Sequence, residues 1–489
     1  MGKAFERREF LQIALGGTIF CLGGSGVFSL GPQAPPSRLV SPGCRRSKVR
    51  VARLYLGVPK SHYPNPTLDL EAERRFYDAE FAKLKAELND VDFVGDELVG
   101  TAEQVQALRG KLQDVDGVLA IHLSLWTLPA LKELLALGLP TTIFSAPYSG
   151  HEWYDLAAIR RQKLGARMEC LLTSDYRQLA RAIRPFRAMH HLREAKILNL
   201  ATAQAQDYAE QVKKKFGTEI KLISPARVLE LYNSVRDEEA RAEADRWVSN
   251  AVAVVEPSTE EIFNSCKLAL AFEKLLDEEE ATVLTVDCYG SMFHQLPAYP
   301  CMGFARLNDL GWGGICQSDL PCAVVHILLQ GLTGRPGFVC NPTFDFDNNA
   351  VILIHCLGST RMDGPDKPAA PYKLRSVMER QEGAVPQVLM RVGQEVTQAI
   401  LHEMTSLRYF TGQITDTPET MRGCRSKITV KLDGDAQKLW QNWTAGIHRV
   451  SCYGKLKQEL AHFCRFKGIE LIDEAGWSPP VTENPEARL

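Results

Sequence analysis

Short apolar runs alternate with amphipathic segments in the first third of the chain. The runs predict strands and the segments with a 3.6-residue period predict helices, in the order strand 49–58, helix 70–88, strand 91–94, helix 102–112, strand 117–122, helix 128–137 and strand 141–144. Strands that alternate with helices form parallel βαβ units. We therefore expect a doubly wound domain over residues 46–165, with a ligand crevice at the carboxyl ends of its strands. Candidate side chains for that crevice are His62, His122, Ser145 and His151.

A second alternating block covers residues 166–300. It begins with a helix predicted from near Leu171 to Ile183, and its later strands and helices alternate in the same way, at strand 196–200, a helix ending at 216, strand 219–223, helix 237–254, helix 260–278 and strand 282–287. This pattern predicts a second doubly wound parallel sheet.

The pattern changes near residue 301. A buried helix is predicted over residues 320–332, and extended segments are predicted at 338–340, 351–355 and 428–432. This mixture indicates an α+β or β-barrel-like C-terminal domain over residues 301–489. The expected fold class is α/β, with two doubly wound parallel-sheet domains followed by this third domain.

The N-terminal segment has a different character. Arg7-Arg8-Glu9-Phe10-Leu11 precedes a Gly-rich, weakly apolar stretch, and Pro residues follow it. The paired arginines resemble the twin-arginine export signal, so residues 1–45 are expected to be a signal peptide and linker. An amphipathic helix or short membrane anchor is the alternative. Export would place the protein in the periplasm or outside the cell, with no stable membrane span, and proteins exported this way cross the membrane already folded.

Composition narrows the classes of function. Of 489 residues, 45% are hydrophobic and 24% are charged, which is typical of a globular protein. Lys plus Arg number 57 against 59 for Asp plus Glu, so the net charge of -2 gives no electrostatic reason to expect nucleic acid as a partner. No Gly-rich phosphate loop follows the first strand, which argues against a nucleotide cofactor. The 13 Cys residues form no CxxC pair, which argues against a structural zinc site.

Polar residues gather at predicted strand ends in the C-terminal half. The run from Cys316 to Cys356, CQSDLPCAVVHILLQGLTGRPGFVCNPTFDFDNNAVILIHC, is followed by IHRVSCYG, a helix and a KGIEL strand. Over roughly residues 281–474 this arrangement resembles the L-fucose and L-arabinose isomerase superfamily. The resemblance implies three domains, a homo-oligomer with active sites near subunit contacts, and aldose to ketose isomerisation through an enediol. It also implies a Mn²⁺-type divalent ion held by two carboxylates and one or two histidines.

The metal ligands of this family do not all have counterparts here. By position, the first carboxylate corresponds to Gln317 and the second to Cys340 or Asn341, whereas the histidines correspond to His355 and His448. An amide coordinates a metal weakly and cannot act as a base at neutral pH. Gln317 and Asn341 are therefore candidate ligands of sugar hydroxyls, or they cap loops. His355 and His448 are candidate metal ligands, alone or with Cys340 in a zinc-like set, or they are core histidines.

Four carboxylates remain for acid and base chemistry, those of Asp319, Asp345, Asp347 and Asp287. The alternation of Phe and Asp over residues 344–347 would place Asp345 and Asp347 on one face of an extended strand, and the alternative is that they form a turn. Asp287 follows a parallel strand, where it is either catalytic or caps a turn. Trp312 is a candidate substrate contact because aromatic faces pack well against sugar rings, and Trp440 and Trp443 have the same character.

The sequence therefore predicts an exported, carbohydrate-active protein that acts on a small sugar or glycoside. Its chemistry is expected to resemble that of the isomerases. Two alternatives remain open: a metal-independent glycoside hydrolase on the same fold, and a non-catalytic sugar-binding or scaffold protein.

Overall fold

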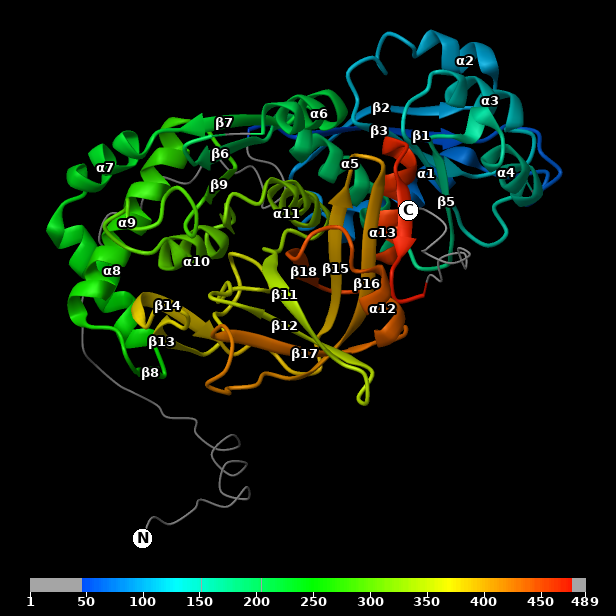
Figure 1. The fold of residues 1–489 in the computed structure, drawn as a ribbon. Coiled ribbons are helices and arrows are strands. Elements are labelled where there is room, and N and C mark those ends of the chain that lie inside the picture. Colours follow the sequence, from blue (N-terminus) through cyan, green and yellow to red (C-terminus); the bar gives the residue numbers. More distant parts are fainter. Residues whose placement is uncertain (1–45, 151, 204, 477–489) are drawn as a thin grey trace, which may run out of the picture. The chain divides into compact units, whose positions relative to one another are not determined.

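A computed structural model describes residues 46–150, 152–203 and 205–476 (Figure 1). The predicted export signal and His151 lie outside the described residues. Four sheets are present in the described part of the chain: a five-stranded sheet A, a four-stranded sheet B, a three-stranded sheet C and a seven-stranded sheet D.

Sheet A is parallel and has the strand order β2-β1-β3-β4-β5. Its strands are β1 (Val49–Leu56), β2 (Val91–Val99), β3 (Gly117–His122), β4 (Thr141–Ser145) and β5 (Met168–Leu172). Its helices are α1 (Leu70–Lys83), α2 (Ala102–Ala107), α3 (Leu128–Ala136), α4 (Trp153–Arg160), the 3₁₀ turn η1 (Lys163–Gly165) and α5 (Gln178–Glu194).

Helices cover both faces of sheet A. On β1, Val49, Val51 and Tyr55 join the core cluster formed with α1 and α5. Leu54 and Leu56 join the opposite cluster, formed with α2, α3 and α4. The doubly wound arrangement predicted for this region is therefore present.

The predicted helix near Leu171 is wrong in part. Residues Met168–Leu172 form β5, which pairs with β4, and the helix begins only at Gln178. A buried strand of five residues is too short to show a clear period in the sequence. Sheet A therefore extends beyond residue 165, although the division of the chain into domains remains a prediction.

Sheet B is also parallel, with the order β10-β9-β6-β7. Its strands are β6 (Lys196–Leu200), β7 (Glu219–Ile223), β9 (Val283–Val286) and β10 (Gly313–Cys316). The surrounding helices are α6 (Gln206–Phe216), α7 (Pro225–Ser234), α8 (Asp237–Asn250), α9 (Thr259–Glu278), α10 (Cys301–Asp309) and α11 (Leu320–Thr333). Sheet B takes β10 from beyond residue 300.

Sheet D contains a closed antiparallel barrel of six strands. The order is β15-β18-β11-β12-β17-β16, and pairing of β15 with β16 closes the ring. β19 extends this sheet by pairing with β16 in parallel. The strands are β11 (Phe338–Asp345), β12 (Ala350–His355), β15 (Glu395–His402), β16 (Ser406–Asp416), β17 (Ser426–Leu432), β18 (Arg449–Tyr453) and β19 (Glu470–Asp473). The predicted barrel-like C-terminal region is therefore present.

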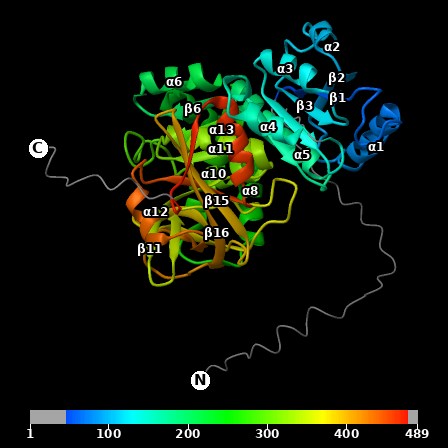
Figure 2. The same ribbon diagram turned by 90° about the vertical axis from the view of Figure 1, so that its right-hand side faces the viewer.

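Two further helices accompany the barrel. α12 (Ala436–Asn442) lies between β17 and β18 in the chain, and α13 (Lys457–Lys467) follows β18. α13 contacts α5, and the two helices lie side by side in Figure 2. α11 contacts β15 and β18, so the helix that begins at Leu320 is held against the barrel wall.

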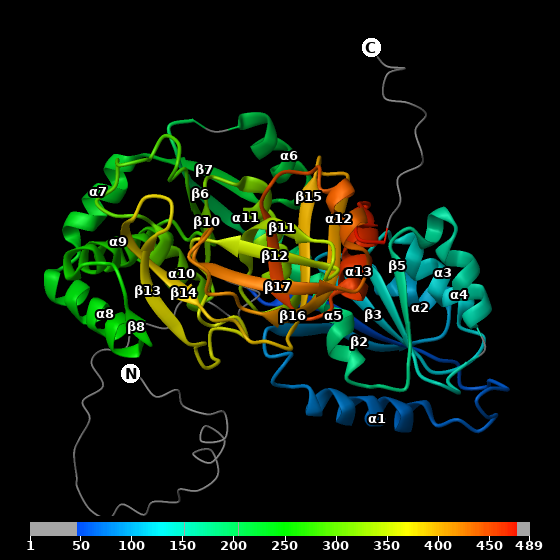
Figure 3. The ribbon, with the colours of Figure 1, turned by 60° about the horizontal axis from the view of Figure 1, so that its bottom comes forward.

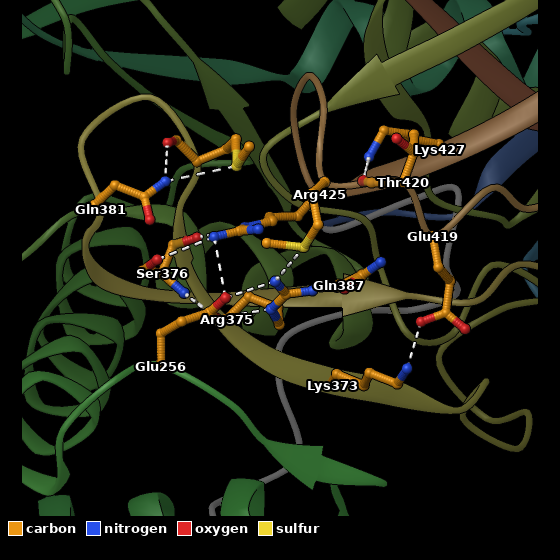
Figure 4. Close-up of polar contacts among 12 residues, drawn as sticks. Glu256, Lys373, Arg375, Ser376, Gln381, Gln387, Glu419, Thr420, Arg425 and Lys427 are labelled. Atoms are coloured by element: carbon orange, nitrogen blue, oxygen red, sulfur yellow. Dashed lines mark hydrogen bonds and ion pairs between the residues drawn. The ribbon is translucent and has the colours of Figure 1, made fainter.

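Sheet C has the order β14-β13-β8 and is visible at the lower left of Figure 3. Its strands are β8 (Ala253–Val254), β13 (Tyr372–Val377) and β14 (Glu382–Val388). A cluster of polar side chains crosses this sheet (Figure 4). Arg375 donates to Glu256 from Nε at 2.7 Å and to Gln387 from Nη1 at 2.8 Å. Arg425 donates to the backbone oxygen of Ser376 at 2.8 Å.

Within the described residues, no helix is long and apolar enough to cross a membrane.

Candidate functional site

The candidate site is built around the first turn of α11. Asp319 is the N-cap of this helix, and its Oδ1 accepts a hydrogen bond from the backbone N–H of Cys322 at 2.9 Å. Its other oxygen, Oδ2, lies 3.1 Å from Nδ1 of His448. A carboxylate can only accept a hydrogen bond, so Nδ1 of His448 carries the hydrogen and Nε2 keeps its lone pair. The cap thus fixes both the position and the tautomer of His448.

His355 lies beside this pair at the end of β12. The ring centroids of His355 and His448 are 5.4 Å apart and the ring planes meet at 63°. His355 is 2% exposed. Burial, with a smaller contribution from the neighbouring His448, lowers its pKa to about 3. His355 is therefore a neutral imidazole at physiological pH, whose Nδ1 has no hydrogen-bond partner among the described residues.

The turn that leads into α11 has an unusual backbone. Gln317 and Ser318 have φ values of 61° and 50°, in the left-handed region that residues other than glycine seldom adopt. Ser318 is held there by a hydrogen bond from its Oγ to Oδ1 of Asn199 at 2.7 Å and by one from its N–H to the carbonyl of Val286. Strained backbone that persists is over-determined by its surroundings and is often found at functional sites. Gln317 belongs to this turn, two residues before Asp319.

Tyr208 is a further residue at this site. It lies on α6, and its hydroxyl is buried without a hydrogen-bond partner among the described residues. Burial raises the pKa of Tyr208, and the carboxylate of Asp319 adds to the shift, which places the phenol near the cap of α11. A buried hydroxyl without a partner costs free energy. It is therefore available to a ligand or a water molecule.

The other predicted site residues do not join this group. Asp287 accepts hydrogen bonds from the N–H and the Oγ of Ser291, both at 2.7 Å, so it caps the turn after β9. Asp345 accepts from the backbone and side chain of Asn348 in the β11–β12 turn. The shared strand face suggested for Asp345 and Asp347 is wrong, because β11 ends at Asp345.

Two predicted substrate contacts lie in other surroundings. Asn341 pairs with Ile354, so its side chain leaves the sheet on the face opposite to that of His355. Its Oδ1 is buried without a partner among the described residues. Trp312 is 3% exposed and packs in the hydrophobic core, so it offers no open aromatic face. Of the side chains singled out in the C-terminal half of the sequence, His355, His448 and Asp319 meet, and Gln317 lies two residues before Asp319 in the chain.

These residues do not suit the divalent ion that the family resemblance implies. Asp319 is engaged by His448 and by the helix N-terminus, and Gln317 offers an amide. Across residues 46–150, 152–203 and 205–476, no group of three or more His, Cys, Asp or Glu side chains is arranged to hold a metal ion. Cys340 hydrogen-bonds with Ser451 and Gln398.

A second polar network lies at the carboxyl edge of sheet A. His122 bonds to Ser145 through Nδ1 at 3.2 Å and to Glu152 through Nε2 at 2.9 Å. Burial alone would raise the pKa of Glu152, but hydrogen bonds from His122 and Thr127 outweigh burial and lower it. Ser145 also lines a cavity of about 490 Å³. The sequence placed His122 and Ser145 at this edge, as found.

Sequence reasoning missed several polar residues of the structure. Glu152 is the N-cap of α4 and gives no pattern of its own, and Tyr208 resembles any residue of an amphipathic helix. Arg449 and Glu474 form a buried ion pair at 2.5 Å beside the barrel, with Arg449 stacked on the ring of Trp443. Arg449 directly follows His448, and Glu474 directly follows β19. These positions could have indicated the pair, because charged residues in apolar runs are seldom buried unless paired.

Comparisons with known proteins give one match and one absence. No family model matches the chain. The chain is 26% identical over 169 residues to a sulfoquinovose isomerase from Alkalicoccus urumqiensis. The match covers 33% of this chain and 37% of that protein. The chain is thus similar to a sugar isomerase along about a third of its length.

Proposed function

We propose that the protein is a carbohydrate isomerase-like enzyme that interconverts an aldose and a ketose at the Asp319–His448–His355 group. The observation that carries the proposal is the geometry of this group, a histidine with a fixed tautomer next to a neutral histidine. The similarity to a sulfoquinovose isomerase supports the same class of reaction. The resemblance of the 281–474 region to the fucose and arabinose isomerases agrees with it.

The residues suggest the following roles. Nε2 of His448 takes the proton from the carbon next to the sugar carbonyl, because Asp319 holds the hydrogen on Nδ1 and stabilises the imidazolium that forms. His355 donates a hydrogen bond from its neutral imidazole to the carbonyl oxygen, where negative charge develops in the enediolate. The hydroxyl proton on the C2 oxygen then passes to the former carbonyl oxygen, and His448 returns the carbon proton to the neighbouring carbon, which completes the isomerisation. This route uses the chain's own side chains and needs no metal.

Proton exchange in heavy water tests the proposal without knowledge of the exact sugar. A panel of aldoses is incubated with the full-length protein, and loss of the C2 proton signal is followed by NMR. We expect exchange with at least one aldose, and we expect His448→Gln to abolish it. His402→Gln serves as the matched control, because His402 is the last residue of β15 and its side chain lies beside that of Glu403.

Two results would count against an isomerase. No exchange with any aldose, from a protein shown to be folded by circular dichroism, would favour the sugar-binding alternative. Unchanged exchange in His448→Gln would place the base elsewhere.

Export is a separate proposal that rests on the Arg7-Arg8 motif alone. Replacing both arginines by lysine should retain the protein in the cytoplasmic fraction, which immunoblotting of cell fractions measures. Export of the Lys-Lys variant would contradict it.

A further inference from the structure

A pocket of about 210 Å³ lies beside α9, α10 and β14. These three elements contact one another in the structure (Figure 1). The pocket is lined by residues of α9, of the segment that joins β9 to α10 and of the start of β14, and we call it the α9 pocket. Of the described residues that line it, none is Asp319, His355 or His448. The α9 pocket is therefore separate from the candidate isomerase site.

Two carboxylates lie on the wall of the α9 pocket, those of Glu261 and Glu382. Oε1 of Glu261 accepts a hydrogen bond from the backbone N–H of Gly383 at 2.6 Å, so this side chain reaches from α9 to the residue next to Glu382. Oε1 of Glu382 accepts from the hydroxyl of Tyr299 at 2.6 Å and lies 3.1 Å from Nε2 of His294. These contacts leave Oε2 of Glu382 without a partner among the described residues.

Both carboxylates are negative at neutral pH. Hydrogen bonds from Tyr299 and His294 lower the pKa of Glu382. Burial alone would raise the pKa of Glu261, but hydrogen bonds from the N–H and the hydroxyl of Ser258 outweigh burial and lower it. The wall of the pocket therefore has two neighbouring negative charges.

A positive charge near these carboxylates does not cancel them. The guanidinium of Arg380 stacks over the ring of Phe293, 4.5 Å from its centroid, and helps to lower the pKa of Glu382. Arg380 is not among the described residues that line the pocket. One guanidinium outside the wall and two carboxylates on it leave an excess of negative charge, which a cation would neutralise.

A buried hydroxyl lies on the same wall. Ser265 follows Glu261 by four residues, so the two side chains lie on one face of α9. Ser265 lines the pocket and is 0% exposed, and its Oγ has no hydrogen-bond partner among the described residues. Because a buried polar group without a partner costs free energy, this hydroxyl is available to a ligand.

Much of the remaining wall is apolar, and is formed by Met292, Leu296, Pro297, Ala298 and Pro300. A volume of about 210 Å³ restricts the ligand to a small molecule. Over the part of the chain that the structure describes, no group of three or more His, Cys, Asp or Glu side chains is arranged to hold a metal ion. Two carboxylates, a hydroxyl and an apolar wall suit an organic cation better than they suit a metal ion.

We propose that the α9 pocket binds a small organic cation, a primary ammonium group on a compact apolar body. The ammonium group has three hydrogens to donate, and its acceptors are Oε2 of Glu382, the carboxylate of Glu261 and Oγ of Ser265. The apolar body packs against Met292 and Leu296 and is removed from water there. Charge-assisted hydrogen bonds to the carboxylates favour the cation over a neutral molecule of the same shape.

Three molecules that share one ring test the charge preference. Cyclohexylamine is a cation at pH 8, cyclohexanol is neutral and cyclohexanecarboxylate is an anion, and ordinary imidazoles are neutral at this pH. Titrations followed by saturation-transfer difference NMR, with the full-length protein, give the dissociation constant of each. We expect the amine to bind about tenfold more tightly than the alcohol, and the carboxylate to bind more weakly than either. Added salt should weaken binding of the amine.

Four variants test which residues hold the ammonium group. Glu382→Gln and Glu261→Gln should each weaken amine binding by about tenfold. Gln also closes a capping box, so Glu261→Gln keeps the start of α9. Ser265→Ala should weaken amine binding by about threefold without lowering the melting temperature of the free protein, because no hydrogen bond within the described residues is lost. Glu419→Gln removes a carboxylate that pairs with Lys373 instead, and should bind the amine as the unaltered protein does.

Three results would overturn the site. They are equal affinity for the amine and the alcohol, no saturation transfer to the amine, and unchanged amine affinity in both Glu382→Gln and Glu261→Gln. The first two come from the unaltered protein, so they hold even if a substitution impairs folding. Because no sugar enters the experiment, failure of the isomerase proposal leaves its result intact.

Discussion

Asp319 has two roles that one substitution separates. Asn caps helices about as well as Asp does, so Asp319→Asn should keep α11 and the stability of the fold. The amide carries no charge to stabilise an imidazolium on His448, and we expect the turnover rate to fall by about 10²-fold or more. Steady-state kinetics with any aldose that shows exchange measures this. An unchanged rate would assign Asp319 to helix capping alone.

The pKa of His355 makes stability depend on pH. Its folded value of about 3 lies below the usual value near 6.5. The unfolded chain therefore binds a proton before the folded one does, so the contribution to stability is present above pH 6.5 and is lost as pH falls towards 3. Between pH 7 and pH 5 this loss amounts to about 2 kcal/mol. Melting curves recorded at both pH values measure this loss in the free energy of unfolding. The loss should be larger by about 2 kcal/mol in the unaltered protein than in His355→Gln.

At this scale the sequence predicted part of the site. His355, His448 and Asp319 were found from their motif positions, and the structure brings them together. Asp345 and Asp287 were not distinguishable from turn formers, because the bonds that occupy them come from Asn348 and Ser291 in local geometry that residue types do not encode. Tyr208 was missed because Asp319, the cap residue near it, lies more than 100 residues away in the chain.

At the scale of elements, Glu256, in the segment that follows β8, forms ion pairs with Arg375 of β13 and with Arg425. Arg375 is 6% and Arg425 is 2% exposed, and both face the carboxylate of Glu256 (Figure 4). Glu256→Gln leaves two buried guanidinium groups without a negative partner. We expect a loss of about 2 kcal/mol in the free energy of unfolding, because unpaired buried charge is costly. Urea unfolding at neutral pH measures it.

The same cluster supplies a matched control. Glu419 pairs with Lys373 at the surface, and Glu419→Gln should change stability by less than about 0.5 kcal/mol. Hydrogen bonding to Arg375 lowers the pKa of Glu256, so its contribution is present above the unfolded value and is lost as pH falls through the folded one. Equal losses from both substitutions would contradict the role given to Glu256.

Elements were predicted best where they are long or regular. The strand at Gly117–His122 and the helix from Leu320 have clear apolar patterns and were found with nearly correct bounds. The strands β13 to β16 were not predicted. They pair with partners in a three-stranded sheet and a closed barrel, and this pairing, more than alternation in their own sequence, determines where they lie.

At the scale of the whole molecule, metal binding can be tested by thermal melting. Because Asp319 is engaged by His448 and the helix N-terminus and Gln317 offers only an amide, we expect Mn²⁺ and Zn²⁺ to leave the melting temperature of the protein unchanged. A metal ion that binds only the folded protein, at a concentration 100 times its dissociation constant, would add about 2.7 kcal/mol to the free energy of unfolding. Such a rise, if lost in both His355→Ala and His448→Ala, would restore the metal-dependent isomerase that the family resemblance implies.

The parallel sheets and the barrel were predictable as classes from the alternation of strands and helices and from its change near residue 301. The sharing of strands between sequence blocks was not. β5 joins sheet A and β10 joins sheet B from beyond the expected boundaries, because hydrogen bonding to neighbouring strands, and not position in the chain, decides membership of a sheet.

Closure of the barrel also has a consequence for how the chain is made. β11 pairs with β18, and Phe338 meets Ser451, a separation of 113 residues (451 minus 338). At roughly 5 to 20 residues per second, the ribosome takes roughly 6 to 23 s to supply that partner. During this interval one edge of β11 has unpaired backbone groups, which other strands can join. The nascent chain should therefore depend on chaperones most strongly between the emergence of β11 and that of β18.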